Sequence, residues 1–278
     1  MLGRPFRVLD HGFVRVVDYM GDDAAIVQAA RVSYGKGTKS VSDDRALIRY
    51  LMRHAHTTPF EMCEIKFHAK LPVFVARQWI RHRTASVNEL SGRYSILDRE
   101  FYVPQPDVLG AQDANARQGR GDALPPGEAR RVLSILRRDA ATAYAHYGGF
   151  LGKRGGGEPL ARELARIGLP VSFYTQWYWK IDLHNLMHFL ALRLHSSAQH
   201  EIREYARVMA SLVRKWVPLA WEAFEDYRLG AVRLSKVEAG IVRRLLRGEE
   251  PREEAAKLTR RERTELAAAL GIDLTRFG

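Results

Sequence analysis

Apolar and polar residues alternate along the first third of the chain with the periods typical of strands and helices. Residues 64–71 alternate strictly and predict a strand, and residues 6–18 alternate in part and predict an earlier one. Elsewhere in this region apolar residues recur every three to four positions, as in an amphipathic helix. Helices are therefore predicted over residues 22–33, 43–55 and 72–83, the first capped by Asp22 or Asp23 and the last opened by Pro72.

The second half of the chain alternates between helical patterns and irregular stretches. Residues 104–127 are rich in proline, glycine and polar residues without periodicity, which predicts a long surface loop or insertion. The glycine-rich residues 148–159 predict a flexible connection, since they lack the spacing of a nucleotide-binding turn. Helices are predicted over residues 128–147 and, as one helix or two, over residues 183–217. A further helix leads through Pro170 into an aromatic-rich segment.

Residues 229–278 differ in character from the rest. Ser235–Glu238 and Thr259–Glu262 both fit the S/T-x-x-E capping box, and Gly271 suits the end of a helix. The tail therefore predicts two short amphipathic helices.

Composition sets broad limits. A chain of 278 residues with 46% apolar and 27% charged residues is typical of a soluble globular protein of one large or two small domains. No apolar run is long enough to cross a bilayer, and charges scattered through the first twenty residues argue against a signal peptide. We therefore expect a cytoplasmic protein. The single cysteine, Cys63, excludes an intrachain disulfide and a cysteine-based zinc site.

The formal net charge of +12 has two interpretations. A basic surface can bind nucleic acid, with Trp79, Tyr94, Trp177 and Trp179 as stacking groups. It can equally attract several anionic small ligands. Composition does not separate the two.

The most informative stretch is RHRTASVNELSGRYS, residues 81–95. It gathers Arg81, Arg83 and Arg93 around Glu89, with three serine hydroxyls nearby. Arginines bind phosphate through paired hydrogen bonds and stay charged, while hydroxyls add neutral hydrogen bonds. The pattern predicts a site for a phosphorylated small molecule, and a solvated charged surface is the alternative.

This stretch fits the motif R-H-R-x-x-S-x-N-E-x-S-x-R-Y at all nine fixed positions, and it resembles the signature of the flavin-dependent thymidylate synthases. Residues 30–34, 54–61 and 164–193 resemble further family segments. The resemblance implies an α+β fold with a mainly antiparallel sheet packed with helices. It assigns residues 1–228 to the catalytic domain and leaves residues 229–278 as a helical C-terminal extension.

The resemblance also implies an activity: methylation of dUMP to dTMP. The carbon would come from 5,10-methylenetetrahydrofolate, and NADPH would reduce a bound FAD. The enzyme would be a homotetramer whose active sites are shared between subunits. A relative that binds FAD but no longer methylates is a further alternative, which the intact signature disfavours.

The resemblance places eight residues at dUMP, namely Gln78, Arg81, Glu89, Ser91, Gly92, Arg93, Arg166 and Arg193. Gly92 would let backbone amides approach the ligand, and Arg93 would clamp the phosphate. Arg166 would reach the nucleotide of a neighbouring subunit. Arg193 would sit beside the pyrimidine, favour its anionic form and so carry the main catalytic role. Without the motif, a salt-bridged surface arginine would be the simpler interpretation.

Eleven residues are implied at FAD, namely Ser33, His56, Thr58, Glu61, Arg81, His82, Arg83, Glu89, Asp182, His184 and His188. Thr58 would donate its hydroxyl to the cofactor, and the alternative is a threonine that caps a turn. Asp182 stands where an asparagine is common, and an ionised carboxylate cannot donate a hydrogen bond. His184 and His188 have metal-ligand spacing, but no third ligand is evident, so no metal is predicted.

Neither possible nucleophile has an activating base. Glu89 lies among arginines that lower a carboxylate's pKa, so Ser91 is predicted to form hydrogen bonds rather than attack. Cys63 has no basic neighbour in sequence and is predicted to be a buried structural residue. This agrees with the resemblance, which implies that no enzyme thiol takes part.

Overall fold

The computed structural model describes residues 1–32, 41–114, 119–152 and 158–274, with the backbone alone described for residues 41–43. The chain divides into two compact units, Met1–Glu225 and Asp226–Gly278. Each is described by itself below. Among the described residues, no helix is both long enough and apolar enough to span a membrane.

The first unit is built on a five-stranded sheet in the order β1-β2-β3-β7-β4, with every neighbouring pair antiparallel. The strands are β1 (Pro5–Val8), β2 (Gly12–Met20), β3 (Glu64–Pro72), β4 (Ser86–Glu89) and β7 (Tyr174–Asp182). The strand predicted over residues 64–71 is confirmed as β3. The strand predicted over residues 6–18 is two strands, because Leu9 adopts a positive φ of 57° and turns the chain.

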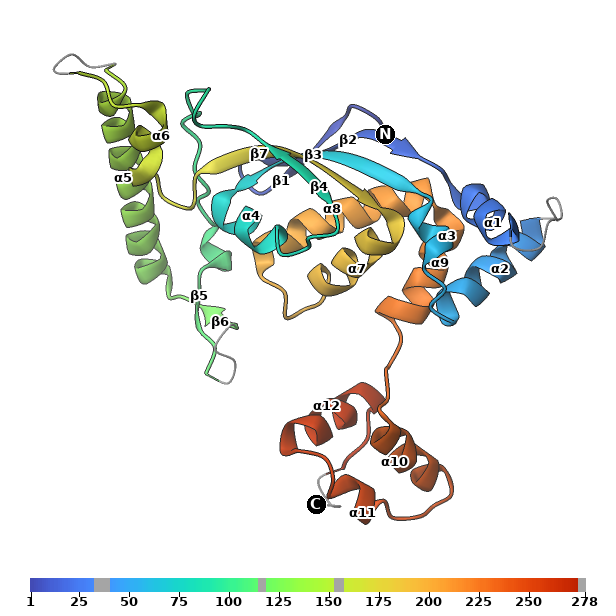
Figure 1. The fold of residues 1–278 in the computed structure, drawn as a ribbon. Helices are drawn as coiled ribbons and strands as arrows, with labels where there is room; N and C mark the ends of the chain where they lie inside the picture. The colour runs from blue at the N-terminus through green and yellow to red at the C-terminus, as the bar shows by residue number, and fades with distance from the viewer. Residues whose placement is uncertain (33–40, 115–118, 153–157, 275–278) are drawn as a thin grey trace. The chain divides into compact units, whose positions relative to one another are not determined.

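Helices cover one face of this sheet (Figure 1). The strictly alternating pattern of β3 turns Ile65, Phe67 and Leu71 into that core, each at most 1% exposed. The covering helices are α4 (Val73–Trp79), α7 (Leu183–Arg193) and α8 (His200–Trp216). Trp79 of α4 is fully buried, and its ring lies against Trp177 and Trp179 at centroid distances of 5.5 and 5.2 Å. The predicted α+β fold with a mainly antiparallel sheet is confirmed.

Four helical segments stand beside the sheet: α1 (Asp23–Arg31), α2 (Val41–Arg53), α3 (Thr58–Glu61) and α9 (Pro218–Phe224). Of the two predicted caps for α1, Asp22 is correct, since its side chain accepts from the Ala25 amide. Asp23 instead accepts from the amides of Leu219 and Ala220, at 2.8 and 2.9 Å. One pair of adjacent aspartates therefore serves the first turns of two helices.

The structureless loop predicted over residues 104–127 is wrong in part. This region holds the 3-10 turn η2 (Pro106–Val108) and a small hairpin of β5 (Gly110–Gln112) and β6 (Arg120–Ala123). Strands of three and four residues are too short to show a period of two. The helix predicted over residues 128–147 is α5 (Pro126–Phe150), so the predicted connection from residue 148 begins three residues later. The short helix α6 (Arg162–Ala165) and turn η3 (Arg166–Gly168) precede Pro170.

The second unit holds α10 (Lys236–Leu246), α11 (Arg252–Ala255) and α12 (Arg260–Leu270), and the π-helical turn η4 (Glu225–Leu229) lies at its start. Both predicted capping boxes form, and Gly271 ends α12 with a φ of 63°. The four-residue α11 was not predicted. The unit has a core of its own, made of Ile241, Ala255, Leu258, Leu266 and Leu274.

Candidate active site

The signature begins where α4 ends and runs into the edge strand β4 (Figure 1). Strand β4 pairs with β7, and β7 leads directly into α7. The fold therefore brings residues 81–95 close to residues 182–193, which lie about a hundred positions later in the sequence. The predicted site residues gather around two groups, named here the Arg193 cluster and the Arg93 cluster.

The Arg193 cluster consists of His82, His188, Phe189 and Arg193. The Arg193 Nε donates to His82 Nε2 at 3.1 Å, and the rings of His82 and His188 lie 5.9 Å apart. Burial, Arg193 and His188 together lower the pKa of His82 to about 4. Burial also lowers the pKa of Arg193, although a guanidinium remains charged near neutral pH. The cluster is thus a neutral imidazole facing a half-buried cation.

A second link ties the signature to the start of α7. The Thr84 hydroxyl donates to Asn185 Oδ1 at 2.9 Å, and Asn185 Nδ2 donates to Asp182 Oδ2 at 2.7 Å. Asp182 Oδ1 accepts from the Asn185 amide at 2.8 Å, so Asp182 is the N-cap of α7. Asn185 was not predicted. An aspartate at the strand-to-helix junction, three residues before an asparagine, could have indicated that this asparagine contacts the capping carboxylate.

The Arg93 cluster consists of Gly92, Arg93, Glu163 and Arg166. Arg93 Nε lies 3.1 Å from Glu163 Oε2, and Arg166 Nε donates to the Glu163 carbonyl at 3.4 Å. Gly92 is buried, and a Cβ built there would lie 3.1 Å from Arg166 Cδ. Glu163 was not predicted, and nothing in its sequence neighbourhood indicates the contact. Within one chain, Arg166 thus lies beside the Gly92 of its own signature.

Two other signature side chains are held within the chain. Glu89 Oε1 accepts from the buried Thr175 hydroxyl at 2.7 Å, which fixes the carboxylate at the sheet edge. Ser91 Oγ accepts from the Arg93 amide at 3.3 Å. The prediction that Ser91 forms hydrogen bonds agrees with this contact, and no base lies against it among the described contacts.

Three polar side chains of this region have groups without a protein partner among the described residues. Gln78 Oε1 is buried and has no hydrogen-bond partner in the described structure. Arg81 and Arg83 are exposed, and neither forms an ion pair or side-chain hydrogen bond with any residue that the structure describes. A buried carbonyl oxygen without a partner costs free energy, and a ligand that donates to Gln78 would offset this cost. These groups suit an anionic ligand with hydrogen-bond donors.

The segment predicted near the flavin lies between α2 and α3. His56 packs edge-on against Tyr50 at 5.7 Å. Thr58 is exposed at the first position of α3, and Thr57, at the cap position, makes no side-chain capping bond. The alternative of a capping threonine is therefore not what the structure shows. Glu61 is half-buried at the end of α3, and Ser33 lies outside the described residues.

The family model for the thymidylate synthase complementing protein matches residues 15–219. The chain belongs to the flavin-dependent thymidylate synthase family. A flavin-dependent thymidylate synthase of Gluconobacter oxydans is 64% identical over 270 residues, which cover 97% of this chain and 88% of that protein. One from Ruegeria pomeroyi is 63% identical over 97% of this chain and 89% of that protein.

Solved structures agree with the family membership. The UMP/dUMP methylase PolB from Streptomyces cacaoi, bound with 5-Br dUMP, superposes with a TM-score of 0.71 at 33% identity. It covers 81% of this chain and 99% of that chain. The curated synthases of this family instead align with 97% of the chain, which takes in most of residues 229–278. The tail is thus shared with those relatives.

Cys63 and three tryptophans lie in the interior of this family member. Cys63 is buried, its Sγ donates to the Asp22 carbonyl at 3.4 Å, and burial raises the pKa of the thiol to about 12. It is the buried structural residue predicted. Trp79, Trp177 and Trp179 are at most 2% exposed, so three of the four aromatics considered for stacking on nucleic acid lie in the core.

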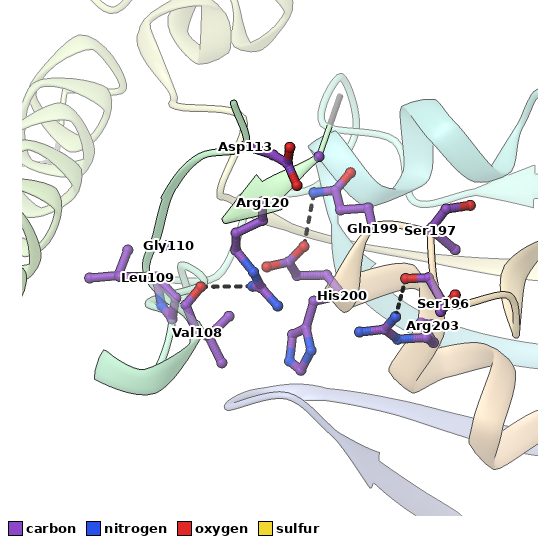
Figure 2. A pocket seen from close by; sticks show the side chains of 14 residues that line it. Val108, Leu109, Gly110, Asp113, Arg120, Ser196, Ser197, Gln199, His200 and Arg203 are labelled. Atoms are coloured by element: carbon purple, nitrogen blue, oxygen red, sulfur yellow. Dashed lines mark hydrogen bonds between the residues drawn. The ribbon is translucent and has the colours of Figure 1, made fainter. Parts of the chain in front are cut away.

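A cavity of about 660 Å³ is lined by none of the predicted dUMP or FAD residues, and Figure 2 shows its lining. It lies between the β5–β6 hairpin and the start of α8. Its buried carboxylate, Glu201, accepts from Tyr102 and Gln199 at 3.1 and 2.9 Å. Arg120 and Arg203 each donate to a backbone carbonyl. Each of these charged side chains makes at least one bond within the chain, although the buried Arg203 Nε has no partner among the described residues. Charges of both signs line the cavity, so it indicates no particular ligand class.

Proposed function

We propose that the protein converts dUMP to dTMP by reductive methylation, with FAD as its redox cofactor. Relatives at 63–64% identity are named flavin-dependent thymidylate synthases, and a structural neighbour is a UMP/dUMP methylase. The observation that carries the proposal is the signature itself. Its Arg81 and Arg83 have no protein partner among the described residues, while the adjacent His82 and Thr84 form hydrogen bonds with α7.

The nucleotide site is proposed to draw on both clusters. Ser91, Gly92 and Arg93 would hold the phosphate, with the Arg93 guanidinium as its clamp. Arg166 would reach the nucleotide of a neighbouring subunit. Gln78, Arg81, Glu89 and Arg193 would contact the nucleoside.

Each active site is proposed to be shared between the subunits of a homotetramer. The residues beside Arg166 support a subunit contact there. Leu164, Ile167 and Val171 are 52%, 75% and 63% exposed. Apolar side chains gathered on a surface are typical of protein interfaces. The cytoplasm as the compartment stays a prediction.

The residues present suit FAD. Its phosphates or ring can accept hydrogen bonds from His82, Arg83, His184 and His188. The Thr58 hydroxyl is also available, because it does not cap α3. His56 and Glu61 stay predicted contacts. Asp182 fits less well, since both carboxylate oxygens accept from Asn185, and its backbone is the better candidate. When bound and reduced by NADPH, FAD supplies the hydride that converts the transferred carbon into a methyl group.

Arg193 is proposed to activate the pyrimidine. Its guanidinium keeps a positive charge in a half-buried position, where charge interactions are stronger than in water. A cation beside the ring stabilises its anionic form, which makes the ring carbon a better nucleophile toward the one-carbon unit of 5,10-methylenetetrahydrofolate. No cysteine is required, consistent with the protonated Cys63 thiol.

The test is dTMP formation by the purified protein with dUMP, 5,10-methylenetetrahydrofolate, NADPH and FAD. We expect turnover in the full mixture and none when FAD is omitted from flavin-stripped protein. Arg193→Ala should keep the fold and bound FAD but lower the rate at least about 100-fold. Turnover without flavin, or an unchanged rate in Arg193→Ala, would contradict the proposal at the step concerned.

A further inference from the structure

His82 makes the only side-chain hydrogen bond to Arg193 among the described residues, and no described carboxylate pairs with that guanidinium. We propose that His82 is the positioning residue of Arg193: its imidazole holds Nε and leaves both terminal nitrogens free for the pyrimidine. A guanidinium on a flexible stem otherwise has several rotamers, and fixing one of them lowers the entropy lost when it acts. The inference rests on the role proposed above for Arg193.

The imidazole itself is held from several sides. Its ring packs edge-on against Phe189 at 4.9 Å and lies 5.9 Å from the ring of His188. Its backbone amide donates to the Trp79 carbonyl at 3.0 Å. Two residues later, Thr84 is bonded to Asn185 at the other end of α7. His82 can therefore set the direction of Arg193 rather than follow it.

A neutral acceptor suits this task better than a carboxylate. A carboxylate would orient Arg193 but would also cancel the charge that the anionic pyrimidine needs. The groups facing His82 are Arg193 and His188 from α7, and with burial they keep the imidazole uncharged near neutral pH. With Nε2 as acceptor, the single ring proton is on Nδ1. The side chain thus orients the cation without neutralising it.

Three substitutions of His82 separate its hydrogen-bond acceptor, its aromatic ring and its lack of charge. His82→Gln keeps a neutral acceptor, His82→Phe keeps an aromatic ring without an acceptor, and His82→Glu keeps an acceptor that neutralises Arg193. We expect His82→Phe and His82→Glu to lower kcat about 100-fold, and His82→Gln to stay within about tenfold of the unmodified enzyme. A His82→Gln variant as slow as His82→Phe would overturn the proposal. If His82→Phe does not fold, equal kcat values for His82→Gln and His82→Glu would overturn it.

A double-mutant cycle distinguishes action through Arg193 from direct flavin binding. The dUMP dissociation constant is measured by calorimetry on FAD-loaded protein without folate, for His82→Phe, Arg193→Ala and the double variant. We expect His82→Phe to weaken dUMP binding in the original chain and to change nothing when Arg193 is already alanine. The FAD affinity, followed by visible absorption, is the control. His82→Phe should lower it to the same extent, or not at all, whether residue 193 is arginine or alanine.

Additive losses of dUMP affinity would overturn the proposal and leave His82 as an independent contact. The dUMP dissociation constant can be measured without turnover, so the cycle also separates the role of His82 from the proposed function. If the unmodified enzyme forms no dTMP, the proposed function fails. If it forms dTMP but the cycle shows no coupling, only the role of His82 fails.

Discussion

At the scale of single residues, the segment around the signature combines side chains held by the protein with side chains that have free groups. His82, Thr84 and Glu89 all have hydrogen-bond partners in the chain. The buried Gln78 oxygen has none, and the exposed Arg81 and Arg83 form no side-chain bond with a described residue. Fixed side chains alternate with free ones along a few positions. Such an arrangement keeps the segment rigid while it reserves hydrogen-bonding capacity for a ligand.

Gly92 gives a prediction about close approach. A Cβ there would lie 3.1 Å from Arg166 Cδ and 3.2 Å from Leu97 Cδ1, so Gly92→Ala must shift the arginine. We expect the KM for dUMP to rise about tenfold, a loss of about 1.4 kcal/mol, with little change in the melting temperature. Gly168→Ala is the matched control, because a Cβ there meets nothing within 4 Å. Equal effects of both substitutions would show that Gly92 has no special role.

The low pKa of His82 predicts a pH dependence of stability. The pKa of His82 in the folded chain is about 4, below the ordinary value of 6.5. Between pH 6.5 and pH 4 the unfolded chain therefore binds a proton at this residue that the folded chain does not bind. The free energy of unfolding should therefore fall from pH 6.5 toward pH 4. One proton contributes at most about 1.4 kcal/mol per pH unit, and less at a partly solvated site.

The measurement compares the melting temperature of the unmodified protein and His82→Gln at pH 7 and pH 4.5. We expect the unmodified protein to lose more on acidification, because glutamine takes up no proton. Parallel losses in both proteins would mean that His82 titrates normally.

At the scale of elements, local patterns were predicted well and distant partners were not. Strict alternation identified β3, and the capping boxes at Ser235 and Thr259 formed as expected, because both signals lie within a few residues. The contacts of Glu163 with Arg93 and of Asn185 with Thr84 join residues 70 and 101 positions apart. Only the fold brings them together. The family motif identified the positions of the candidate site, but it did not indicate which side chains hold the others.

Asp182 is predicted as a flavin contact, and the structure shows that its side chain caps the first turn of α7. Asp182→Ala should lower the free energy of unfolding by about 1 kcal/mol, since the Asn185 amide loses its acceptor. Asp182→Asn should keep most of the stability, because asparagine is an equally good N-cap. Urea denaturation of the three proteins decides. If Asp182→Asn is as unstable as Asp182→Ala, the charge rather than the cap is what matters.

At the scale of the whole molecule, the chain combines a catalytic unit with a second unit of about fifty residues. The tail aligns with the curated synthases but has its own buried core around Ile241, Leu258 and Leu266. A core this small stabilises a unit only marginally. The predicted catalytic domain, residues 1–228, contains every site residue proposed here.

Deleting residues 229–278 should therefore leave an active oligomer, since no proposed site residue is lost. Leu266→Ala in the full chain also tests whether activity and assembly are independent of the tail, without removing any residue. Its side chain is 3% exposed, and its truncation should cost about 2–5 kcal/mol, enough to unfold a marginal unit. Calorimetry should then show loss of the tail's transition, while dTMP formation and the mass by light scattering stay unchanged. Loss of the assembly in both variants would instead assign the tail a structural role in the oligomer.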